Sequence, residues 1–532
     1  MKQNKKQKKK KKHEKQNKYR EKTKEFLNFL ENNKLFLAIF IITTTYFVYE
    51  NIISLSWDFS VYILNAKYYF AESTYFEVGR PPIASLIMGI LGIIIGWRLA
   101  EILFVIITAT LFAYAIYKLS QTLKFDPATL YALSMNTFVI TYALAVGTEL
   151  LSLAFLIIAT TMIIKNNATS GIFLGISALA RYNALGMFPM LLFHFNTKKI
   201  IKSLILFGIV IASWLTYNYF AFGNAFESIA NLYSMNIINR QDIAQPFNIM
   251  HIIKSINILM PLFLIGLFKV IINTTKDIIK HNKTKKIIQE IKNKKTELLM
   301  LAILIYTIYN YATTPLKIAR YLFFITLPII YFSYIGLETI IQKVKNKKII
   351  QRTIATTLFI ISMIAILTIA QPYYDEPRPY EETKTILEEL NLTNCYIESN
   401  IYPQLNYLEI TSAVFPRQEL IERNIDDGSI MVFFKSAGEP EYVRDEEFMK
   451  SLPIIKENER LYIIGKEKCA QKEPYTRSYL QEIYDYVLKQ HDYEININPC
   501  FIMFQKYSIL EKTCNFAHGK GFKIDENRET II

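Results

Sequence analysis

Long apolar runs separated by short polar segments fill the chain from residue 35 to residue 371. An α-helix needs about 17 to 25 predominantly apolar residues to cross the hydrocarbon layer of a bilayer. Residues 1–34 are instead rich in lysine, and residues 372–532 mix polar and apolar positions as a globular sequence does. The pattern therefore predicts three parts: a basic tail (1–34), a membrane domain (35–371) and a C-terminal domain outside the bilayer (372–532).

The membrane domain is expected to be a polytopic α-helical bundle with about 11 crossing or partly crossing helices, counted by the length rule for spanning segments. The segment 83–95 is too short to cross and follows Pro81-Pro82, so it is expected to lie in the membrane interface. The expected crossing segments are 35–53, 99–119, 128–146, a fourth span that ends at 164, a pair within 171–195, 200–220, 252–272, 298–311, 322–341 and 354–369.

The apolar stretch 171–195 is interrupted by Arg181-Tyr182-Asn183. A single crossing here would place Lys198 and Lys199 on the opposite side of the membrane from the other basic loops, against the positive-inside rule. A hairpin of two short helices that turns near Arg181 keeps all basic loops on one side. Two full crossings do not fit in this length, so we expect an incomplete or re-entrant pair whose turn is buried in protein.

Composition and charge agree with a membrane protein. The chain is 52% hydrophobic and carries a formal net charge of +15. Such an excess of basic residues is also found in nucleic-acid-binding proteins. Here the basic clusters lie in the N-terminal tail and in short loops between apolar runs, where the positive-inside rule places them. We therefore expect a multi-pass protein of the cell membrane, in contact with lipids and not with nucleic acid, with a cytoplasmic N-terminus and an extracytoplasmic C-terminal domain.

The C-terminal domain has the pattern of a layered α/β fold. Residues Glu381–Leu390 and Tyr479–Leu488 have helical spacing, and Cys395–Glu398, Ile430–Phe434 and Leu461–Gly465 are candidate strands. The domain contains no glycine-rich phosphate loop, no histidine cluster with metal-ligand spacing and no nucleophile elbow. Its expected role is structural or recognition of the acceptor.

All four cysteines of the chain, Cys395, Cys469, Cys500 and Cys514, lie in this C-terminal domain. Disulfides are typical of extracytoplasmic domains. Four cysteines allow three pairings, and the sequence does not choose among them.

Ionisable residues gather near one predicted side of the bundle. An isolated acid at a span boundary, such as Asp58, is usually a helix cap or a solvated group. Several ionisable residues on one side of a bundle instead indicate a polar cavity. An acid beside cations suits a group transfer, because the acid activates a hydroxyl while the cations stabilise a departing phosphate. The other members are Arg80, Arg98, Glu149, Arg181, Lys317 and Arg320; Glu72 and Glu77 are alternative bases, and Glu101 is the expected partner of Arg98.

The segment from Asp58 to Arg98, with Pro81-Pro82 and its interfacial helix, resembles the first external loop of polyprenyl-phosphate-dependent membrane glycosyltransferases. This is the GT-C class, which includes the protein mannosyltransferases and the aminoarabinose transferases. Four further segments are similar to motifs of that class and follow in its order: Thr148-Glu149 to a second acidic position, Gly175 to Asn183 to a glycine-rich short helix, Trp214 to Phe226 to a tryptophan–asparagine–glycine segment, and Arg320-Tyr321 to Pro328 to an arginine–tyrosine–proline span.

The resemblance implies a helical bundle with its active site at the outer face and a sugar donor carried on polyprenyl or dolichyl phosphate. Asp58 would then be the catalytic base of an inverting transfer to an acceptor hydroxyl on a glycan, lipid or protein. Glu149 would take the second acidic position, and Arg80, Arg320 and Arg181 would bind the donor phosphate. No cofactor is implied, and Asp58 with Glu149 makes a poor cation cage, although a divalent metal stays open.

One feature departs from the family. Protein mannosyltransferases often have two adjacent acids in the first loop, whereas Asp58 is followed by Phe59. This favours a more general sugar transferase. The main alternative function is a transporter or flippase of lipid-linked sugars, which also needs polar groups inside a bundle but usually shows internal repeats. A membrane anchor for the C-terminal domain would need one span only.

Overall fold

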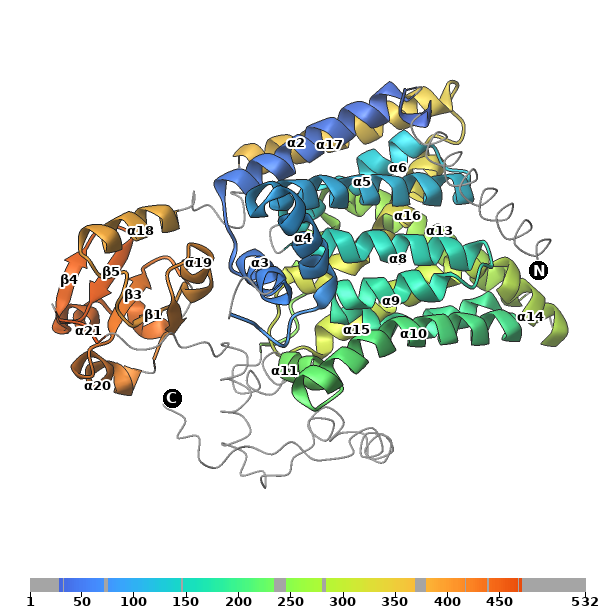
Figure 1. Ribbon diagram of the computed structural model, residues 1–532. Coiled ribbons are helices and arrows are strands. Elements are labelled where there is room, and N and C mark those ends of the chain that lie inside the picture. Colours follow the sequence, from blue (N-terminus) through green and yellow to red (C-terminus); the bar gives the residue numbers. More distant parts are fainter. Residues whose placement is uncertain are drawn as a thin grey trace, which may run out of the picture.

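The structure is a computed structural model in which a bundle of helices is joined at one end to a small α/β unit (Figure 1). It describes residues 28–31, 33–70, 75–144, 147–233, 245–279, 284–368, 379–416, 418–437, 440–466 and 468–470. All structural statements below concern these residues. We call residues 379–470 the α/β unit and the residues that precede them the bundle.

Six apolar segments in the described part of the chain are long enough to cross a membrane: α2 (Lys34–Ile53), α5 (Trp97–Leu123), α10 (Thr197–Phe222), α12 to α13 (Ile249–Asp277), η4 with α16 (Ala319–Ile340) and α17 (Lys347–Thr368). Three shorter apolar helices lie among them: α4 (Pro82–Ile95), α8 (Glu149–Ile164) and α9 (Ser170–Ala180). The expected multi-pass helical bundle is therefore confirmed as a fold, while the number of about 11 crossings stays a prediction.

The hairpin expected around Arg181 is confirmed. Helix α9 is followed by the 3-10 helix η1 (Tyr182–His194). The Oγ of Ser170 lies 2.8 Å from Nε2 of His194, so the end of η1 has returned to the start of α9. Arg181 thus occupies the turn between the two segments.

The continuous span expected over 128–146 is wrong. The structure has two short helices there, α6 (Pro127–Ser134) and α7 (Thr137–Tyr142). Asn136 lies between them and caps α7, because its Oδ1 accepts a hydrogen bond from the backbone N–H of Val139 at 3.2 Å. Asparagine is one of the preferred helix N-caps, and this cap competes with continuation of the preceding helix.

The α/β unit contains a five-stranded sheet in the order β2-β1-β3-β5-β4. Strand β1 is parallel to β2 and β3, whereas β5 is antiparallel to β3 and β4. The expected α/β fold is therefore present, and the helix expected at Tyr479–Leu488 lies outside the described residues. The strands are β1 (Ile397–Ser399), β2 (Ser412–Val414), β3 (Ile430–Phe434), β4 (Ile454–Glu457) and β5 (Leu461–Ile464); the helices are α18 (Pro379–Glu389), α19 (Tyr402–Tyr407), α20 (Ile421–Asp426) and α21 (Glu446–Ser451).

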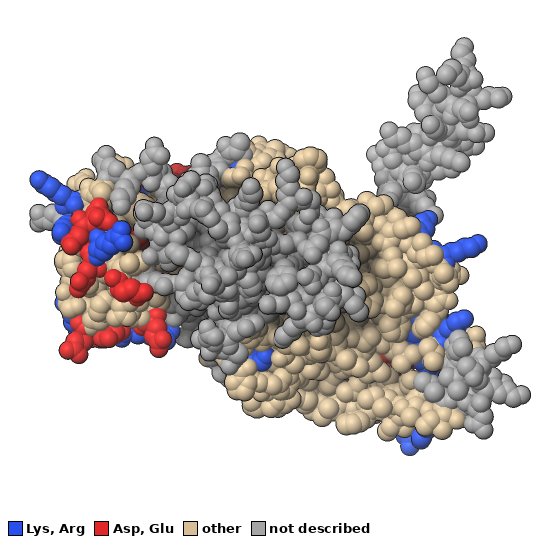
Figure 2. All heavy atoms as spheres, turned by 90° about the horizontal axis from the view of Figure 1, so that it is seen from below, with Lys and Arg blue, Asp and Glu red and all other residues tan. Residues whose placement is uncertain are grey.

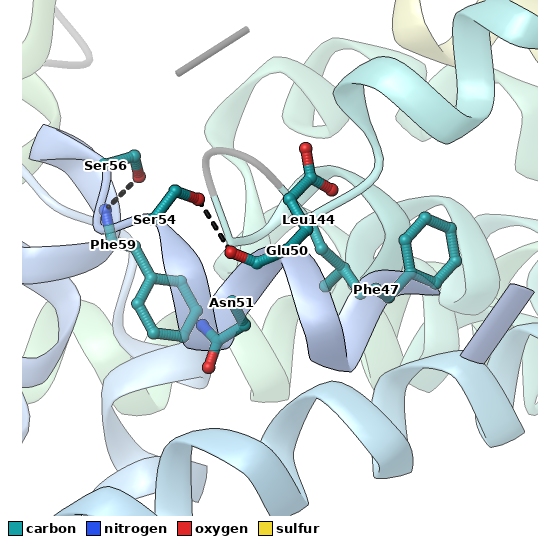
Figure 3. A pocket seen from close by; sticks show the side chains of 7 residues that line it. All are labelled: Phe47, Glu50, Asn51, Ser54, Ser56, Phe59 and Leu144. Carbon is teal, nitrogen blue, oxygen red and sulfur yellow. Dashed lines mark hydrogen bonds between the residues drawn. The ribbon is translucent and has the colours of Figure 1, made fainter. Parts of the chain in front are cut away.

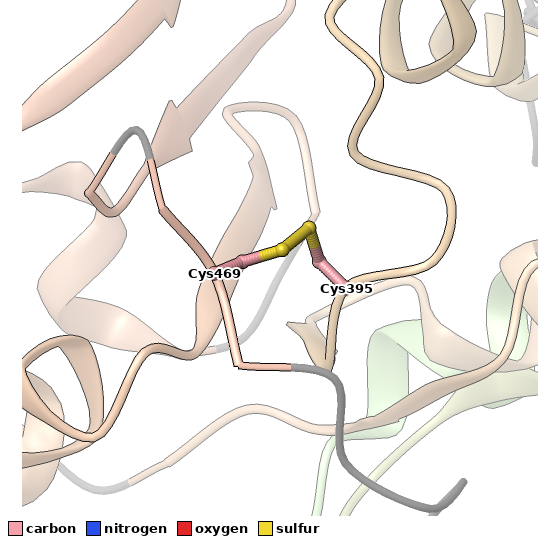
Figure 4. Close-up of a disulfide and its surroundings, with 2 residues drawn as sticks. All are labelled: Cys395 and Cys469. Atoms are coloured by element: carbon pink, nitrogen blue, oxygen red, sulfur yellow. A yellow bond between two sulfur atoms is a disulfide. The ribbon is translucent and has the colours of Figure 1, made fainter.

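A disulfide between Cys395 and Cys469 closes the α/β unit (Figure 4). The bond joins the segment before β1 to the segment after β5. The Cα atoms of the two cysteines are 5.5 Å apart. The backbone N–H of Tyr396 also donates to the carbonyl of Ala470 at 3.1 Å. Of the pairings left open by the sequence, the structure contains this one; Cys500 and Cys514 lie outside the described residues.

Charged side chains are distributed unevenly along the molecule. Figure 2 shows acidic residues, together with some basic ones, on the α/β unit and basic residues at the opposite end. The exposed Lys124, Lys165 and Lys198 lie at the ends of α5, α8 and α10 that are far from the α/β unit. The basic end is the one that the positive-inside rule would place in the cytoplasm.

Two helices of the bundle touch through glycine. A Cβ atom added at Gly266 of α13 (Met260–Ile279) would lie 1.8 Å from the carbonyl oxygen of Phe332 in α16 (Thr326–Ile340). One added at Gly336 of α16 would lie 1.9 Å from the carbonyl oxygen of Leu262. Small residues let membrane helices approach until their backbones are in contact. This contact fixes how closely α16, which continues from η4, lies against α13.

We expect Gly266→Ala to lower the thermal unfolding midpoint of the purified protein in detergent, because the added methyl group must push α13 and α16 apart. Overpacking of this kind costs about 1–3 kcal/mol. The control is Gly208→Ala in α10, where a Cβ would meet nothing within 4 Å. Alanine at that position should be neutral or stabilising. Equal midpoints for the two variants would contradict the close contact.

Candidate functional site

Asp58 lies in the first turn of α3 (Trp57–Tyr69), the helix that follows the first span. Ser56 caps this helix by accepting a hydrogen bond from the backbone N–H of Phe59 at 3.1 Å. The cap fixes where α3 begins, and a carboxylate in the first turn is favoured by the positive end of the helix dipole. The Asp58 side chain is 11% exposed, so it is held at a defined position close to solvent.

Two arginines from distant parts of the chain share the Asp58 carboxylate. Arg80, in the loop before α4, donates from Nη1 to Oδ1 of Asp58. Arg320, in η4 (Ala319–Ile325), donates from Nη1 to Oδ2 at 2.9 Å. The three side chains are mostly buried, with 11% of Arg80 and 17% of Arg320 exposed. The structure thus brings together three of the five residues expected from the sequence to form the site.

Glu77 orients Arg80 from the other side. Its Oε2 accepts from Nε of Arg80 at 2.9 Å, and its Oε1 accepts from the hydroxyl of Tyr75 at 2.6 Å. Asn65 of α3 holds the backbone of Glu77 with two hydrogen bonds of 2.9 Å, one to its N–H and one to its carbonyl. Glu77 is fully buried, so it acts as a support for Arg80 and has no open side toward solvent. Glu72, the other alternative base, lies outside the described residues.

The charges of this cluster balance. The carboxylates of Asp58 and Glu77 face the guanidinium groups of Arg80 and Arg320. Burial on its own would raise the pKa of Asp58, but the two arginines outweigh burial and hold this pKa well below its usual value. The two carboxylates likewise outweigh burial at Arg80 and raise its pKa. Asp58 is therefore ionised, and its negative charge is already neutralised.

Glu149 and Arg181 form a second ion pair beside the first cluster. Arg181, which caps the C-terminal end of α9, donates from Nη1 to Oε1 of Glu149 in the first turn of α8. The Glu149 side chain is fully buried and that of Arg181 is 13% exposed. Tyr62 of α3 lies between the two clusters: burial raises its pKa most, and Arg80, Asp58 and Arg181 also act on it. The expected second acidic position is therefore adjacent to the site and paired with the expected third cation.

The remaining candidates lie apart from Asp58. Arg98 pairs with Glu101 at 3.0 Å, as expected from the sequence. Lys317 donates from its ammonium group to the carbonyls of Tyr311 and Ala312 at the end of α15 (Lys295–Thr313), at 3.2 and 3.0 Å. Lysine near the last carbonyls of a helix stabilises that helix end. Across the described ranges, no group of three or more His, Cys, Asp or Glu side chains is arranged to hold a metal ion.

Sequence reasoning missed several residues around Asp58. Tyr75 and Asn65 were not singled out, because a single aromatic residue or a single amide carries little signal by itself. Glu50 was also missed, although an acid inside an apolar run is such a signal. Its side chain is buried, and no hydrogen bond or ion pair to its carboxylate is found within the described residues. It lines a small pocket behind the start of α3 (Figure 3), whose lining residues are Phe47, Glu50, Asn51, Ser54, Ser56, Phe59 and Leu144.

Comparison with known proteins identifies the fold. No protein-family model and no curated protein sequence matches the chain. Among solved structures, the chain is similar to ArnT from Cupriavidus metallidurans bound to undecaprenyl phosphate, with a TM-score of 0.53, 8% identity, and coverage of 84% of this chain and 100% of that one. It is also similar to the apo state of the same ArnT, with a TM-score of 0.52, 9% identity, and coverage of 81% and 97%.

The bundle therefore has a GT-C-like fold. The similarity also extends past the bundle. It covers 84% of the 532 residues, which is more residues than the chain has from its start to Thr368, the last described residue of the bundle.

We expect Arg181→Met to destabilise the protein strongly, because it leaves the carboxylate of Glu149 buried without its cation. Removing one partner of a buried ion pair costs about 3–5 kcal/mol. Adding Glu149→Gln should restore part of the loss, since the unpaired charge is then removed. The measurement is the unfolding midpoint of the purified variants.

The control for this prediction is Lys450→Met, which breaks a pair with Glu446 whose side chains are 58% and 74% exposed. An exposed pair contributes little to stability, so this variant should unfold close to the wild type. If Arg181→Met also unfolded at the wild-type midpoint, the buried pair would not have the structural role that we assign to it.

Proposed function

We propose that this protein is an integral membrane glycosyltransferase that moves a sugar from a polyprenyl- or dolichyl-phosphate donor to the hydroxyl of an acceptor. The observation that supports this most is the Asp58 carboxylate held between the guanidinium groups of Arg80 and Arg320 at one end of a GT-C-like bundle. A carboxylate provides a base, and guanidinium groups bind phosphate with good geometry.

In the proposed reaction, Asp58 accepts the proton of the acceptor hydroxyl. The acceptor oxygen forms a bond to the anomeric carbon of the sugar, and the bond from that carbon to the phosphate oxygen breaks. The electron pair leaves with the polyprenyl phosphate, whose negative charge Arg80 and Arg320 stabilise. Attack from the face opposite the departing phosphate inverts the anomeric configuration. Arg181 is a third candidate for the phosphate, and Glu149 holds it in place.

The charge balance of the site adds a link between donor binding and base strength. Both arginines are neutralised by carboxylates in the absence of donor. A donor phosphate brings further negative charge and competes with Asp58 for the same guanidinium groups. As Asp58 loses part of that contact, its pKa rises toward the usual value, and the carboxylate becomes a stronger base when the donor is present.

The donor class, the orientation and the division into domains belong to the same proposal. The ArnT structure that the chain resembles holds undecaprenyl phosphate, and we propose a donor of that chemical type here. The basic end of the bundle and the positive-inside rule support a cytoplasmic N-terminus, with the site and the α/β unit on the outer side of the cell membrane. We also keep the division into a tail (1–34), a membrane domain (35–371) and a C-terminal domain (372–532). The acceptor is a glycan, lipid or protein.

We expect Asp58→Asn to reduce sugar transfer from a radiolabelled polyprenyl-phosphate sugar at least about a hundredfold, because the amide has nearly the same shape but does not accept the proton. The measurement is release or transfer of the sugar by purified protein in lipid nanodiscs. The control is Asp126→Asn, which also removes a carboxylate paired with an arginine, Arg352 at 2.7 Å, but at the far end of the bundle.

Both variants are compared with wild type at equal amounts of folded protein. Full activity of Asp58→Asn would move the role of base to another acid, with Glu149 the next to test. If the wild-type protein cleaves no lipid-linked sugar from a panel of donors, the proposed donor class is wrong.

We expect Arg320→Gln to raise the pKa of Asp58, because one of the two cations that lower it is removed. The base is active when ionised, so the acid limb of the kcat/KM profile should move to higher pH. KM for the donor should also rise if Arg320 binds its phosphate. An acid limb at the same pH in wild type and Arg320→Gln would contradict the role of Asp58 as the titrating base.

A further inference from the structure

Tyr402 of the α/β unit contacts the ion cluster of the candidate site. Figure 1 shows α19, which begins at Tyr402, beside α3. The ring of Tyr402 is 1% exposed and lies in a small cluster with Leu64, Tyr75 and Trp57 of the bundle. It meets the ring of Trp57 edge to face at 4.9 Å and that of Tyr75 at 6.1 Å. Tyr402 therefore packs both against α3, which carries Asp58, and against the loop that carries Glu77.

The hydroxyl of Tyr402 continues this contact into the ion cluster. It donates to Oε1 of Glu77 at 3.3 Å, the same oxygen that accepts from Tyr75 at 2.6 Å. The other oxygen of Glu77 accepts from Nε of Arg80 at 2.9 Å. A chain of contacts thus runs from the α/β unit through Glu77 and Arg80 to Asp58.

We propose that the α/β unit is a working part of the site, in which Tyr402 is a positioning residue that holds Glu77 and thereby orients Arg80 against Asp58. The consequence for catalysis depends on the proposed function, whereas the positioning itself does not. Tyr402 acts through Glu77, whose carboxylate its hydroxyl contacts, and through Trp57, the neighbour of Asp58 in the sequence.

A second contact of the same helix provides a matched control. Tyr407, at the other end of α19, donates to Oε1 of Glu101 at 2.5 Å, and Glu101 pairs with Arg98 at 3.0 Å. The ring of Tyr407 also lies 5.9 Å from the ammonium group of Lys67. Both tyrosines therefore join α19 to a buried glutamate of the bundle. Glu77, the partner of Tyr402, contacts Arg80, which binds Asp58, whereas Glu101, the partner of Tyr407, pairs with Arg98.

The two tyrosines are expected to differ when each is replaced. Tyr402→Ala removes the aromatic ring and leaves space beside Trp57 and Glu77. Glu77 can then move, and the guanidinium group of Arg80 that it binds is held less precisely. Misplacement of a catalytic group by about 1 Å is enough to cost on the order of a hundredfold in rate. We expect kcat to fall at least about tenfold by the same argument. Tyr402→Phe keeps the ring and loses one long hydrogen bond, so it should recover most of the activity. Tyr407→Ala should keep kcat near the wild-type value.

The pH profile separates positioning from a general loss of stability. Arg80 from the loop, Arg320 from η4 and Tyr62 from α3 face Asp58, and Glu77 stands behind Arg80. A loosened Arg80 lowers the pKa of Asp58 less effectively, so the acid limb of kcat/KM should move to higher pH in Tyr402→Ala. Tyr407→Ala should leave that limb unchanged, although it weakens the docking of the same helix.

Hydrogen–deuterium exchange tests the positioning without any donor. The N–H of Glu77 donates to Oδ1 of Asn65 at 2.9 Å, and the N–H of Arg80 donates to the carbonyl of Glu77 at 3.3 Å. We expect faster exchange in peptides covering 75–81 of the full-length protein for Tyr402→Ala, and not for Tyr407→Ala. Exchange in peptides covering α13 and α16 should match wild type in both variants, which shows that the bundle is folded.

The outcomes keep the two proposals apart. If wild-type protein transfers no sugar but exchange over 75–81 rises in Tyr402→Ala alone, the positioning stands and the proposed function fails. If Tyr402→Ala and Tyr407→Ala have equal exchange over 75–81, or equal kcat and the same acid limb, Tyr402 is an ordinary docking contact and the inference is overturned.

Discussion

One carboxylate shared by two guanidinium groups sets the geometry on which the described structure depends. Asp58 is bound by Arg80, which is 22 residues away in sequence, and by Arg320, which is 262 residues away. The first helix after α2, the loop before α4 and the 3-10 helix before α16 must therefore meet at one end of the bundle. The glycine contact fixes how closely α16, which continues from η4, lies against α13. Arg181 ends α9.

Buried charges are costly unless each one is paired and hydrogen-bonded. Here the cost is met within the protein itself: two carboxylates face two guanidinium groups, and Glu149 faces Arg181. An incoming anion therefore has to compete for guanidinium groups that already face carboxylates. In the proposed reaction, this competition gives a physical reason for an aspartate with a low pKa to serve as the base, since an anion that displaces it from the arginines also raises its pKa.

The sequence predicted those features that are carried by local pattern. Apolar run length predicted the spanning helices, and the positive-inside rule, with Arg181 interrupting an apolar run, predicted the hairpin. The clustering of Asp58, Arg80 and Arg320 followed from placing charged residues at the same ends of the spans. The break at Asn136 was missed, because one polar residue in an apolar run does not by itself predict a cap. The disulfide pairing was beyond reach because it depends on how the α/β unit folds, and the contact between Tyr402 and Glu77, 325 residues apart, because it depends on how that unit docks.

The docking also makes the bundle and the α/β unit one structural unit. Residues of the α/β unit such as Ile401 and Leu405 belong to the same buried cluster as Phe59 and Ile63 of α3, so the core of the unit continues into the helix that carries Asp58. Removing the unit would expose that apolar surface and would damage the site for reasons unrelated to any specific contact. Substitutions of Tyr402 and Tyr407 in α19 are therefore more informative than removal of the unit. Each leaves Ile401 and Leu405 of the shared core in place and removes the contact with one glutamate of the bundle.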